Sequence, residues 1–267
     1  MKGKDFVITG GSGMVGHAFK RVLPSSLYPN REEIASLCFD INNKNLIHLA
    51  AKVGGLGANL SKMAEFYYEN SQLNQGVLHH AYKHSAKKVV SLLSTCIYPS
   101  KEFVKYPLTE DQLHQGPPHF SNYGYAYSKR MVDVMSRAYR KQYGCNFITA
   151  VPNNLFGEND NFDLENSHVI PALIRKVWEA KITNQPEIQC WGDGTPLREF
   201  TYSADIAEIL LFLIENYNEP DPINIGNTDE YSIKEVVEMI CDLLNYPGKI
   251  KWQTQKPNGQ HRKPSCN

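Results

Sequence analysis

The sequence lacks the features that mark membrane, nucleic-acid-binding and metal-binding proteins. No apolar run approaches the roughly 20 residues that a membrane-spanning helix needs, so we expect no membrane partner. Basic and acidic residues number 28 each, and this zero net charge provides no broad basic surface for nucleic acid. A strand is expected almost at the first residue, in place of a signal peptide, so we expect a cytoplasmic protein.

The cysteines also show no paired metal-ligand spacing, which is typical of a chain kept reduced and without a metal site. The six cysteines are Cys38, Cys96, Cys145, Cys190, Cys241 and Cys266. Most are expected to be small buried residues. Cys96 differs because it directly follows a predicted strand.

Short apolar runs alternate with helix-like sequence in the first part of this 267-residue chain. The runs cover residues 6–9, 46–51, 89–93 and 147–151, and a further strand is expected to end near Asn30 and Arg31. This alternation predicts an α/β fold with a doubly wound parallel sheet of the Rossmann type. Ligands in such sheets bind beyond the carboxyl ends of the strands, so residues 94–96 and 152–154 should line one cleft.

The first apolar run ends in a glycine-rich turn, and a helical pattern follows it. The turn consists of Gly10, Gly11, Ser12, Gly13, Met14, Val15 and Gly16. Glycines allow a tight turn and close approach of the backbone to a pyrophosphate, which the N-terminus of the following helix then binds. A purely structural turn is the alternative, but the flanking strand and helix favour dinucleotide binding.

Arg31 is expected near the adenosine end of that cofactor. Dinucleotide folds that prefer NAD place an acidic side chain there, whereas a guanidinium suits the additional phosphate of NADP. Glu32 and Glu33 follow directly, so a solvated surface arginine is the alternative. We predict a preference for NADP(H).

A second, smaller α/β domain is predicted to bind substrate. We assign residues 1–152 and 196–219 to the cofactor domain, and residues 153–195 and 220–267 to the substrate domain. Ser232 and Glu235 form a capping-box pattern that predicts the start of a helix, and a short strand is expected around Ile250.

Tyr125 and Lys129 lie four residues apart at the start of a predicted helix and therefore share one face. An unperturbed phenol titrates at about 10, and the Lys129 ammonium is expected to lower the pKa of Tyr125 toward neutrality. Ser94, after the third run, would donate a hydrogen bond to the same substrate oxygen. A chance spacing on an amphipathic helix is the alternative.

Several longer strings extend this pattern over nearly the whole chain. They are GGSGMVG at 10–16, HLAAKVGG at 48–55, LSTCIYP at 93–99, YAYSK at 125–129, PNNLFG at 152–157, NSHVIP at 166–171 and WGDGTPLR at 191–198. In these strings the chain resembles the extended short-chain dehydrogenase/reductase family, and within it the GDP-L-fucose synthases. The stretch between the first helix and the run at 46–51 looks shortened, and Asn258 stands where many relatives carry Asp.

The resemblance implies an NADPH-dependent 3,5-epimerisation and 4-reduction of GDP-4-keto-6-deoxymannose to GDP-L-fucose, in a homodimer paired through helices beginning near Met63 and Tyr125. It implies a reductase triad and an epimerisation pair, with Cys96 as base and His168 as acid. The triad is Ser94, Tyr125 and Lys129. Substrate contacts are implied for Lys176, Trp191, Arg198, Asn258 and Lys263. Beyond the glycine turn and Arg31, cofactor contacts are implied for Leu49, Ala50, Ala51, Leu92, Leu93, Lys129, Pro152, Asn153, Asn154, Leu155 and His168.

The sequence leaves two other interpretations of the chain. A nucleotide-sugar 4-epimerase or 4,6-dehydratase is the first, but a dehydratase would be expected to carry an acidic pair near Thr95, where Cys96 and Ile97 stand. A catalytically silent NADP-binding regulator is the second. Loss of Tyr125 or Lys129 would be its expected sign, and both are present.

Overall fold

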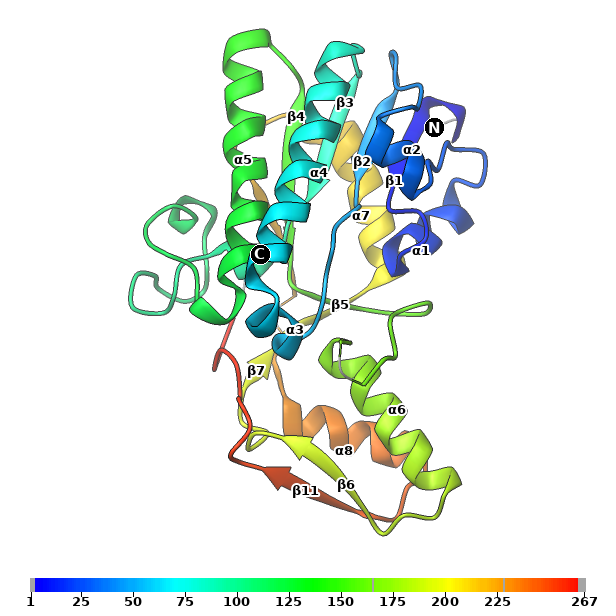
Figure 1. Ribbon diagram of the computed structural model, residues 1–267, viewed down its shortest axis with the longest axis vertical. Coiled ribbons are helices and arrows are strands. Elements are labelled where there is room, and N and C mark those ends of the chain that lie inside the picture. Colours follow the sequence, from blue (N-terminus) through cyan, green and yellow to red (C-terminus); the bar gives the residue numbers. More distant parts are fainter. Residues whose placement is uncertain (1–2, 165, 228, 264–267) are drawn as a thin grey trace.

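The computed structural model describes residues 3–164, 166–227 and 229–263, so Cys266 and the end of the predicted substrate domain lie outside the described residues. Figure 1 shows a larger lobe with a sheet between helices, and a smaller lobe that contains α6, α8, β6 and β11. None of the described helices is both long and apolar enough to cross a membrane.

A five-stranded sheet forms the centre of the larger lobe, with strand order β1-β2-β3-β4-β9 and parallel pairing throughout. Its strands are β1 (Phe6–Thr9), β2 (Asn45–His48), β3 (Lys88–Leu92), β4 (Phe147–Pro152) and β9 (Ile223–Ile225). The first four are buried along their whole length, as expected for strands covered on both faces. The prediction of a doubly wound parallel sheet is confirmed.

Alternate residues of β1, β2, β3 and β4 contribute to two separate cores on opposite faces of the sheet. Phe6, Ile8 and Ile47 pack with α1 (Met14–Val22) and α7 (Ser203–Asn216). Val7 and Leu46 contact the opposite core instead, which includes residues of three helices. These are α2 (Arg31–Ser36), α4 (Met63–Lys83) and α5 (Tyr123–Tyr143). Because successive strand residues point to opposite faces, short apolar runs are enough to build both cores.

The strand predicted to end near Asn30 and Arg31 was wrong. In the described part of the chain, the segment before α2 makes a single parallel bridge beside β1, at Leu27. Pro29 has no amide hydrogen to extend the pairing, and Asn30 caps α2 by accepting hydrogen bonds from the amides of Glu32 and Glu33. The chain therefore turns into a helix where a longer strand was expected.

The smaller lobe has its own core, in which α6 and α8 pack with strands β6 and β11. Its elements are α6 (Val169–Ile182), β6 (Glu187–Trp191), β7 (Leu197–Arg198), β10 (Tyr231–Ser232), α8 (Ile233–Leu243) and β11 (Lys249–Gln253). The predicted capping box at Ser232 and Glu235 is present and begins α8. The three tryptophans of the chain, Trp178, Trp191 and Trp252, all lie in this lobe.

Shorter elements connect the two lobes and line the space between them. They are β5 (Asn154–Phe156), β8 (Phe200–Tyr202), α3 (Leu56–Ser61) and the 3₁₀ turns η2 (Thr95–Ile97) and η4 (Phe120–Asn122). Residues of the other two 3₁₀ turns, η1 (Gly3–Asp5) and η3 (Glu110–Gln112), do not line that space. β9 pairs with β4 in the large sheet, although residues 220–267 were assigned to the substrate domain. The division into domains stays a prediction. By its residue range β9 belongs to the predicted substrate domain, but it pairs with the sheet of the larger lobe.

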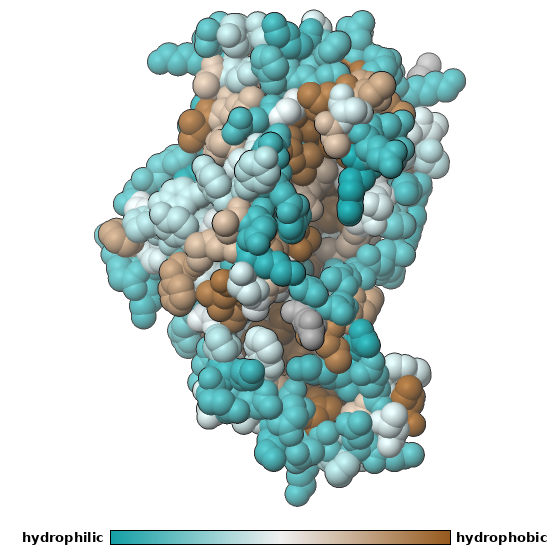
Figure 2. All heavy atoms as spheres, viewed as in Figure 1, coloured by the Kyte–Doolittle hydropathy of each residue, from teal (hydrophilic) through white to brown (hydrophobic). Residues whose placement is uncertain are grey.

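The surface is mostly hydrophilic in the view of Figure 2. It is hollowed between α4 and α1, where hydrophobic side chains are visible. This hollow leads toward the carboxyl ends of the strands, where the sequence predicts the site.

Candidate active site

One cleft, with a volume of about 1610 Å³, extends from the glycine turn after β1 to the smaller lobe. Every residue that the sequence analysis named as catalytic, cofactor-binding or substrate-binding lines it. The structure thus brings together side chains from positions 10 to 263, because the parallel strands end on the same side of the sheet. The individual roles of these residues remain predictions.

The glycine turn has the shape that a dinucleotide phosphate requires. Gly10 has φ +78°, and a Cβ atom on Gly16 would lie 2.2 Å from the carbonyl oxygen of Gly10. Gly13 caps α1 with no side-chain hydrogen bond to the helix. The first amides of α1 are therefore available to an anion, and only glycine fits at position 16.

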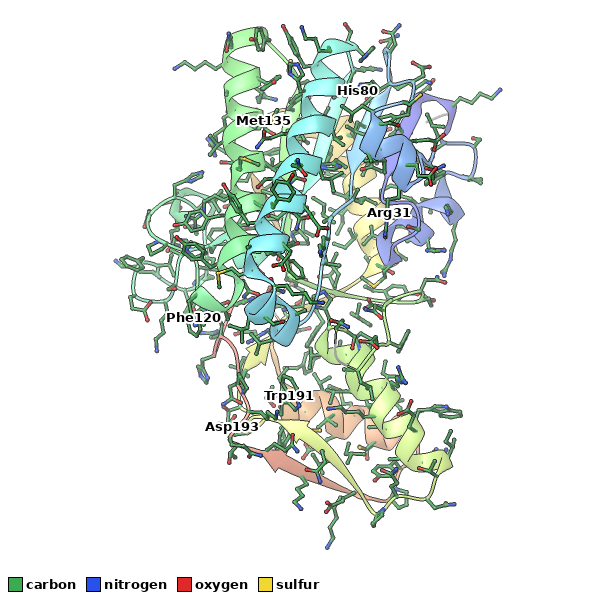
Figure 3. The ribbon with its side chains drawn as sticks, in the orientation of Figure 1. Arg31, His80, Phe120, Met135, Trp191 and Asp193 are labelled. Carbon is green, nitrogen blue, oxygen red and sulfur yellow. The ribbon has the colours of Figure 1, made fainter. Side chains whose placement is uncertain are left out.

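Arg31 begins α2 and lies at the cofactor end of the cleft (Figure 3). It has no ion-pair partner within 4.0 Å among the described residues. Glu33, the nearest candidate in sequence, accepts a hydrogen bond from the backbone amide of Asn30 at 2.6 Å. The Arg31 guanidinium is therefore exposed and not engaged by these carboxylates.

Lys129 and Tyr125 lie on α5, but the expected effect of the lysine on the phenol was wrong. Burial raises the pKa of Tyr125, and the nearby Cys96 thiolate raises it further. Lys129 is buried and donates a hydrogen bond of 2.9 Å to the carbonyl oxygen of Leu92, at the end of β3. Burial also lowers the pKa of Lys129 to about 8, which weakens its hold on a positive charge. Tyr125 is therefore a protonated phenol, suited to donating a proton.

A buried polar network that the sequence analysis missed lies beside Lys129. The ring of His48 bonds to Thr9 Oγ1 through Nδ1, at 2.8 Å, and to Asn74 Oδ1 through Nε2, at 3.0 Å. The Asn74 amide nitrogen donates to the carbonyl oxygen of Ser128 at 3.2 Å. This network joins β1, β2 and α4 to the helix turn that carries Lys129. A histidine inside an otherwise apolar strand was the available signal.

Cys96 lies in η2, directly after β3, and faces two cations. The Ser94 hydroxyl accepts a hydrogen bond from the Cys96 amide at 3.3 Å and begins this turn. Lys263 Nζ lies 3.3 Å from the Cys96 sulfur. Burial alone would raise the pKa of the thiol, but Lys263, Ser94 and the Arg198 guanidinium lower it by more. The site therefore favours a thiolate at Cys96.

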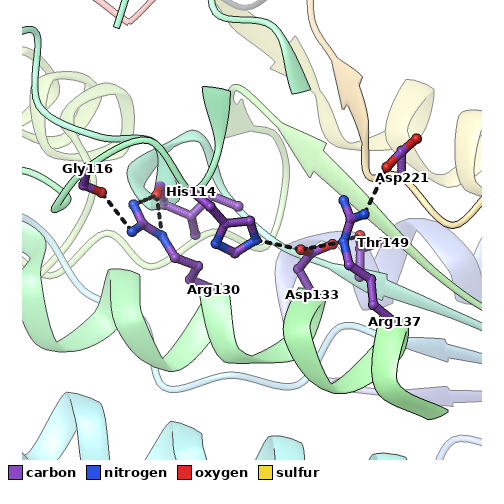
Figure 4. A network of polar contacts seen from close by, with 8 residues as sticks. His114, Gly116, Arg130, Asp133, Arg137, Thr149 and Asp221 are labelled. Carbon is purple, nitrogen blue, oxygen red and sulfur yellow. Dashed lines mark hydrogen bonds and ion pairs between the residues drawn. The ribbon is translucent and has the colours of Figure 1, made fainter. Parts of the chain in front are cut away.

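Hydrogen bonds from α5 hold the η2 turn in place, and Figure 4 shows this region from close by. Arg130, the residue after Lys129, donates hydrogen bonds from Nε and Nη2 to the carbonyl oxygen of Ile97 and from Nη1 to that of Gly116. Adjacent residues of α5 thus contact the end of β3, through Lys129, and the turn that carries Cys96, through Arg130. Beside it, the buried Asp133 carboxylate bonds to His114 and Arg137.

His168 is the N-cap residue of α6 and lines the cleft, with no side-chain hydrogen bond to the helix. Burial by the cleft wall lowers the pKa of His168, the Asp160 carboxylate opposes this change, and Lys263 adds to it. The Oδ2 atom of Asp160 is buried and has no hydrogen-bond partner among the described residues. Asp160 is a second residue that the sequence analysis missed.

The predicted substrate residues fall into two groups. Trp191, at the end of β6, is 43% exposed beside the turn at Asp193 (Figure 3), and Lys176 donates to the carbonyl oxygen of Gln189 at 3.0 Å. Asn258 instead accepts a hydrogen bond from the Asp193 amide at 2.9 Å. Arg198 donates to backbone carbonyls of residues 197, 260 and 261. These last two side chains hold the segment that carries Lys263.

The chain matches the family model described as "NAD dependent epimerase/dehydratase family" over residues 28–226. It is 40% identical to the GDP-L-fucose synthase of Dictyostelium discoideum, over 99% of this chain and 87% of that protein. It is 39% identical to the GDP-L-fucose synthase of Sinorhizobium fredii, over 98% and 87%.

A solved structure, "Crystal structure of a gdp-l-fucose synthetase from Naegleria fowleri bound to NADP", is 36% identical to the chain. It superimposes with a TM-score of 0.89 and covers 100% of this chain and 86% of that one. The chain therefore belongs to the NAD-dependent epimerase/dehydratase family, and within it to the GDP-L-fucose synthases.

Proposed function

We propose that the chain catalyses the NADPH-dependent 3,5-epimerisation and 4-reduction of GDP-4-keto-6-deoxy-D-mannose to GDP-L-fucose. The observation that carries this proposal is the presence of two proton-transfer groups in one cleft with a reductase triad. Cys96 and His168 line the same cleft as Ser94, Tyr125 and Lys129. A plain ketone reductase needs only the triad, whereas inversion of carbons beside the ketone needs a base and an acid as well.

The residues of the cleft fit a bound NADPH. The glycine turn and the N-terminus of α1 would bind its diphosphate, Lys129 its nicotinamide ribose, and Arg31 the additional phosphate on the adenosine ribose. The exposed guanidinium of Arg31, which forms no ion pair with the carboxylates of the described residues, supports the last assignment. When bound, the cofactor supplies the hydride that reduces the ketone.

Epimerisation begins with removal of a proton from a carbon next to the ketone. The thiolate of Cys96 accepts that proton, and the electron pair of the C–H bond moves into the carbonyl to form an enolate. Tyr125 and Ser94 donate hydrogen bonds to the enolate oxygen, which stabilises the charge that develops there. His168 returns a proton on the opposite face of the carbon, so that the carbon is inverted.

Reduction needs a proton on the same oxygen, and Tyr125 gives it. Its raised pKa means that the phenol is protonated when the ketone arrives. One donor therefore serves both half-reactions.

The nucleotide end of the substrate would contact the smaller lobe. Lys176 and Lys263 supply local positive charge for the diphosphate, which a chain of zero net charge must provide from individual residues. Trp191 offers an exposed ring for stacking on the base. We also propose that Arg198 and Asn258 contact the substrate directly, in addition to the backbone contacts that both residues make.

We also propose a cytoplasmic homodimer that pairs through α4 and α5. These helices pack side by side and expose the aromatic residues Tyr67, Tyr68 and Tyr143. A second copy would bury these rings in a four-helix interface. Light scattering at micromolar concentration is expected to give twice the mass of the chain, and a monomer there would contradict the proposal.

The test of the function is incubation with GDP-4-keto-6-deoxymannose in D₂O without cofactor, followed by mass spectrometry of the sugar. The wild-type protein should introduce deuterium beside the ketone, and NADPH should then give GDP-L-fucose, identified by NMR. In Cys96→Ser the thiol, with a reference pKa of about 8.5, is replaced by a far weaker acid, so deuterium incorporation should collapse.

His168→Gln should impair inversion while permitting exchange of the proton that Cys96 removes. Deuterium incorporation that persists in Cys96→Ser would show that another residue is the base. Reduction without any exchange in the wild-type protein would favour a plain 4-reductase.

A further inference from the structure

Lys263 contacts the sulfur of Cys96 from a segment that the two lobes hold in place. We call residues 258–263 the strap. The Lys263 side chain is buried, and its ammonium nitrogen lies 3.3 Å from Cys96 Sγ. A buried lysine costs free energy unless an anion or acceptors compensate its charge. The Cys96 sulfur is such a partner only as a thiolate.

Contacts on both sides of the strap fix the position of Lys263. From the smaller lobe, Arg198 Nη2 donates to the carbonyl oxygen of Gln260 at 2.6 Å, and the Leu197 amide donates to that of His261 at 2.9 Å. From the larger lobe, the Tyr106 hydroxyl donates to the carbonyl oxygen of Arg262 at 2.9 Å. The lysine is therefore presented to Cys96 by the fold.

An ion pair anchors the strap immediately before Lys263. The guanidinium of Arg262 bonds to both carboxylate oxygens of Glu230, with Nε at 3.0 and 2.8 Å. Bidentate pairs of this kind restrict both position and orientation. The Lys263 backbone thus has little freedom to move away from the thiol.

The charged groups around this pair favour a thiolate. Cys96 faces Lys263 from the strap, Arg198 from β7 and the phenol of Tyr125 from α5. Lys263 itself faces two histidines, His119 and His168. Burial and then Lys263 lower the pKa of His119, and burial lowers that of His168 despite Asp160, with Lys263 adding to the change. Of these groups, Lys263 is the one whose nitrogen contacts the sulfur.

We propose that Lys263 is a positioning residue that keeps Cys96 in the thiolate form from which it removes the substrate proton. The inference rests on the proposed function for the identity of that proton. In the step, the sulfur gains the proton, the C–H electron pair moves to the enolate, and Lys263 keeps its own proton throughout. The thiol afterwards loses its proton to solvent, and the ion pair forms again.

The experiment measures the thiol directly and needs no sugar substrate. The full chain is treated with iodoacetamide over a range of pH, and alkylation of the peptide that contains Cys96 is followed by mass spectrometry. Exposed Cys38 is thereby excluded from the signal. The variants are Lys263→Met, Lys263→Arg, and Lys256→Met as the matched control, because Lys256 lies over the Trp191 ring.

The midpoint of alkylation in the wild-type protein should lie below the free-cysteine value of about 8.5. Lys263→Met should raise it by at least about one pH unit, a tenfold loss of thiolate at a given lower pH. Lys263→Arg should restore most of the shift, and Lys256→Met should leave the midpoint unchanged. Circular dichroism and NADPH binding establish that the variants are folded.

An unchanged midpoint in Lys263→Met would overturn the proposal. So would a loss of GDP affinity without a change in the thiol, since that result makes Lys263 a diphosphate ligand only. If the midpoint shifts but the wild-type protein introduces no deuterium into the keto sugar, the ion pair stands and the proposed function fails. The two ideas are therefore tested separately.

Discussion

The buried ring of His48 should make the fold sensitive to mild acid. Burial, followed by the nearby charge of Lys129, lowers the pKa of His48 to about 3, while the hydrogen bond to Asn74 opposes this change. Asn74 Oδ1 can only accept, so Nε2 carries the ring proton and Nδ1 accepts from the Thr9 hydroxyl. The network is thus complete with a neutral ring, and a second ring proton would place an uncompensated charge in the core.

The sign and size of the effect follow from the two pKa values. In the unfolded chain histidine binds a proton below a pKa of about 6.5, whereas the folded state takes it up only near 3. The unfolded state therefore binds more protons between these values, and stability falls as the pH decreases. Between about pH 7.5 and pH 5, this one residue should cost about 2 kcal/mol in free energy of unfolding.

The perturbation is His48→Gln, because glutamine can accept from Thr9 and donate to Asn74 but does not titrate. The variant should be less stable than the wild-type protein at neutral pH. On acidification, its free energy of unfolding should fall by about 2 kcal/mol less than that of the wild-type protein. Urea unfolding at both pH values, followed by circular dichroism, gives the two differences.

His84→Gln is the matched control, because His84 is exposed at the C-terminus of α4. It should leave the pH dependence of unfolding as it is in the wild-type protein. If the wild-type protein and His48→Gln lose the same free energy on acidification, the folded state must bind a proton at His48 and the reasoning is wrong.

Three further changes test other parts of the molecule. Gly16→Ala places a methyl group 2.2 Å from the backbone oxygen of Gly10, so NADPH affinity measured by calorimetry should fall at least about tenfold; unchanged binding would remove the close approach from the argument. Tyr125→Phe should slow 4-reduction by about 100-fold or more while NADPH binding stays nearly intact, and an unchanged rate would dismiss Tyr125 as the proton donor. Lys88→Met removes the donor to the carbonyl oxygens of residues 213, 214 and 217 at the end of α7. The free energy of unfolding, measured in urea, should therefore fall by about 2–3 kcal/mol. A stability equal to that of the wild-type protein would mean that water replaces the ammonium.

The features that short stretches of sequence encode could be predicted. The parallel sheet follows from apolar runs between helices, and the position of the cleft follows from where those runs end. The capping box of Ser232 and Glu235 is a local pattern of hydrogen bonds and appears as expected. In each case the physical cause lies within a few residues of the signal.

Features that depend on contacts distant in sequence could not be predicted. Tyr125 and Lys129 both lie on α5, four residues apart, but the Lys129 ammonium donates its hydrogen bond to the carbonyl oxygen of Leu92. Burial is the main cause of the raised pKa of the Tyr125 phenol. The contact between Cys96 and Lys263 joins positions 167 residues apart. The strand expected near Arg31 failed because a proline and a helix cap compete locally with sheet pairing.

The placement of the three tryptophans confines tryptophan fluorescence to one lobe of the molecule. Trp178, Trp191 and Trp252 all belong to the smaller lobe, so intrinsic tryptophan emission reports on that lobe alone. Trp191 also lines the cleft, and Lys256 lies 5.2 Å from its ring. A stacked nucleotide base should therefore quench part of this emission, whereas melting of the larger lobe alone should leave it nearly unchanged. Substrate binding and the unfolding of the smaller lobe can thus be followed by fluorescence, without attaching a dye.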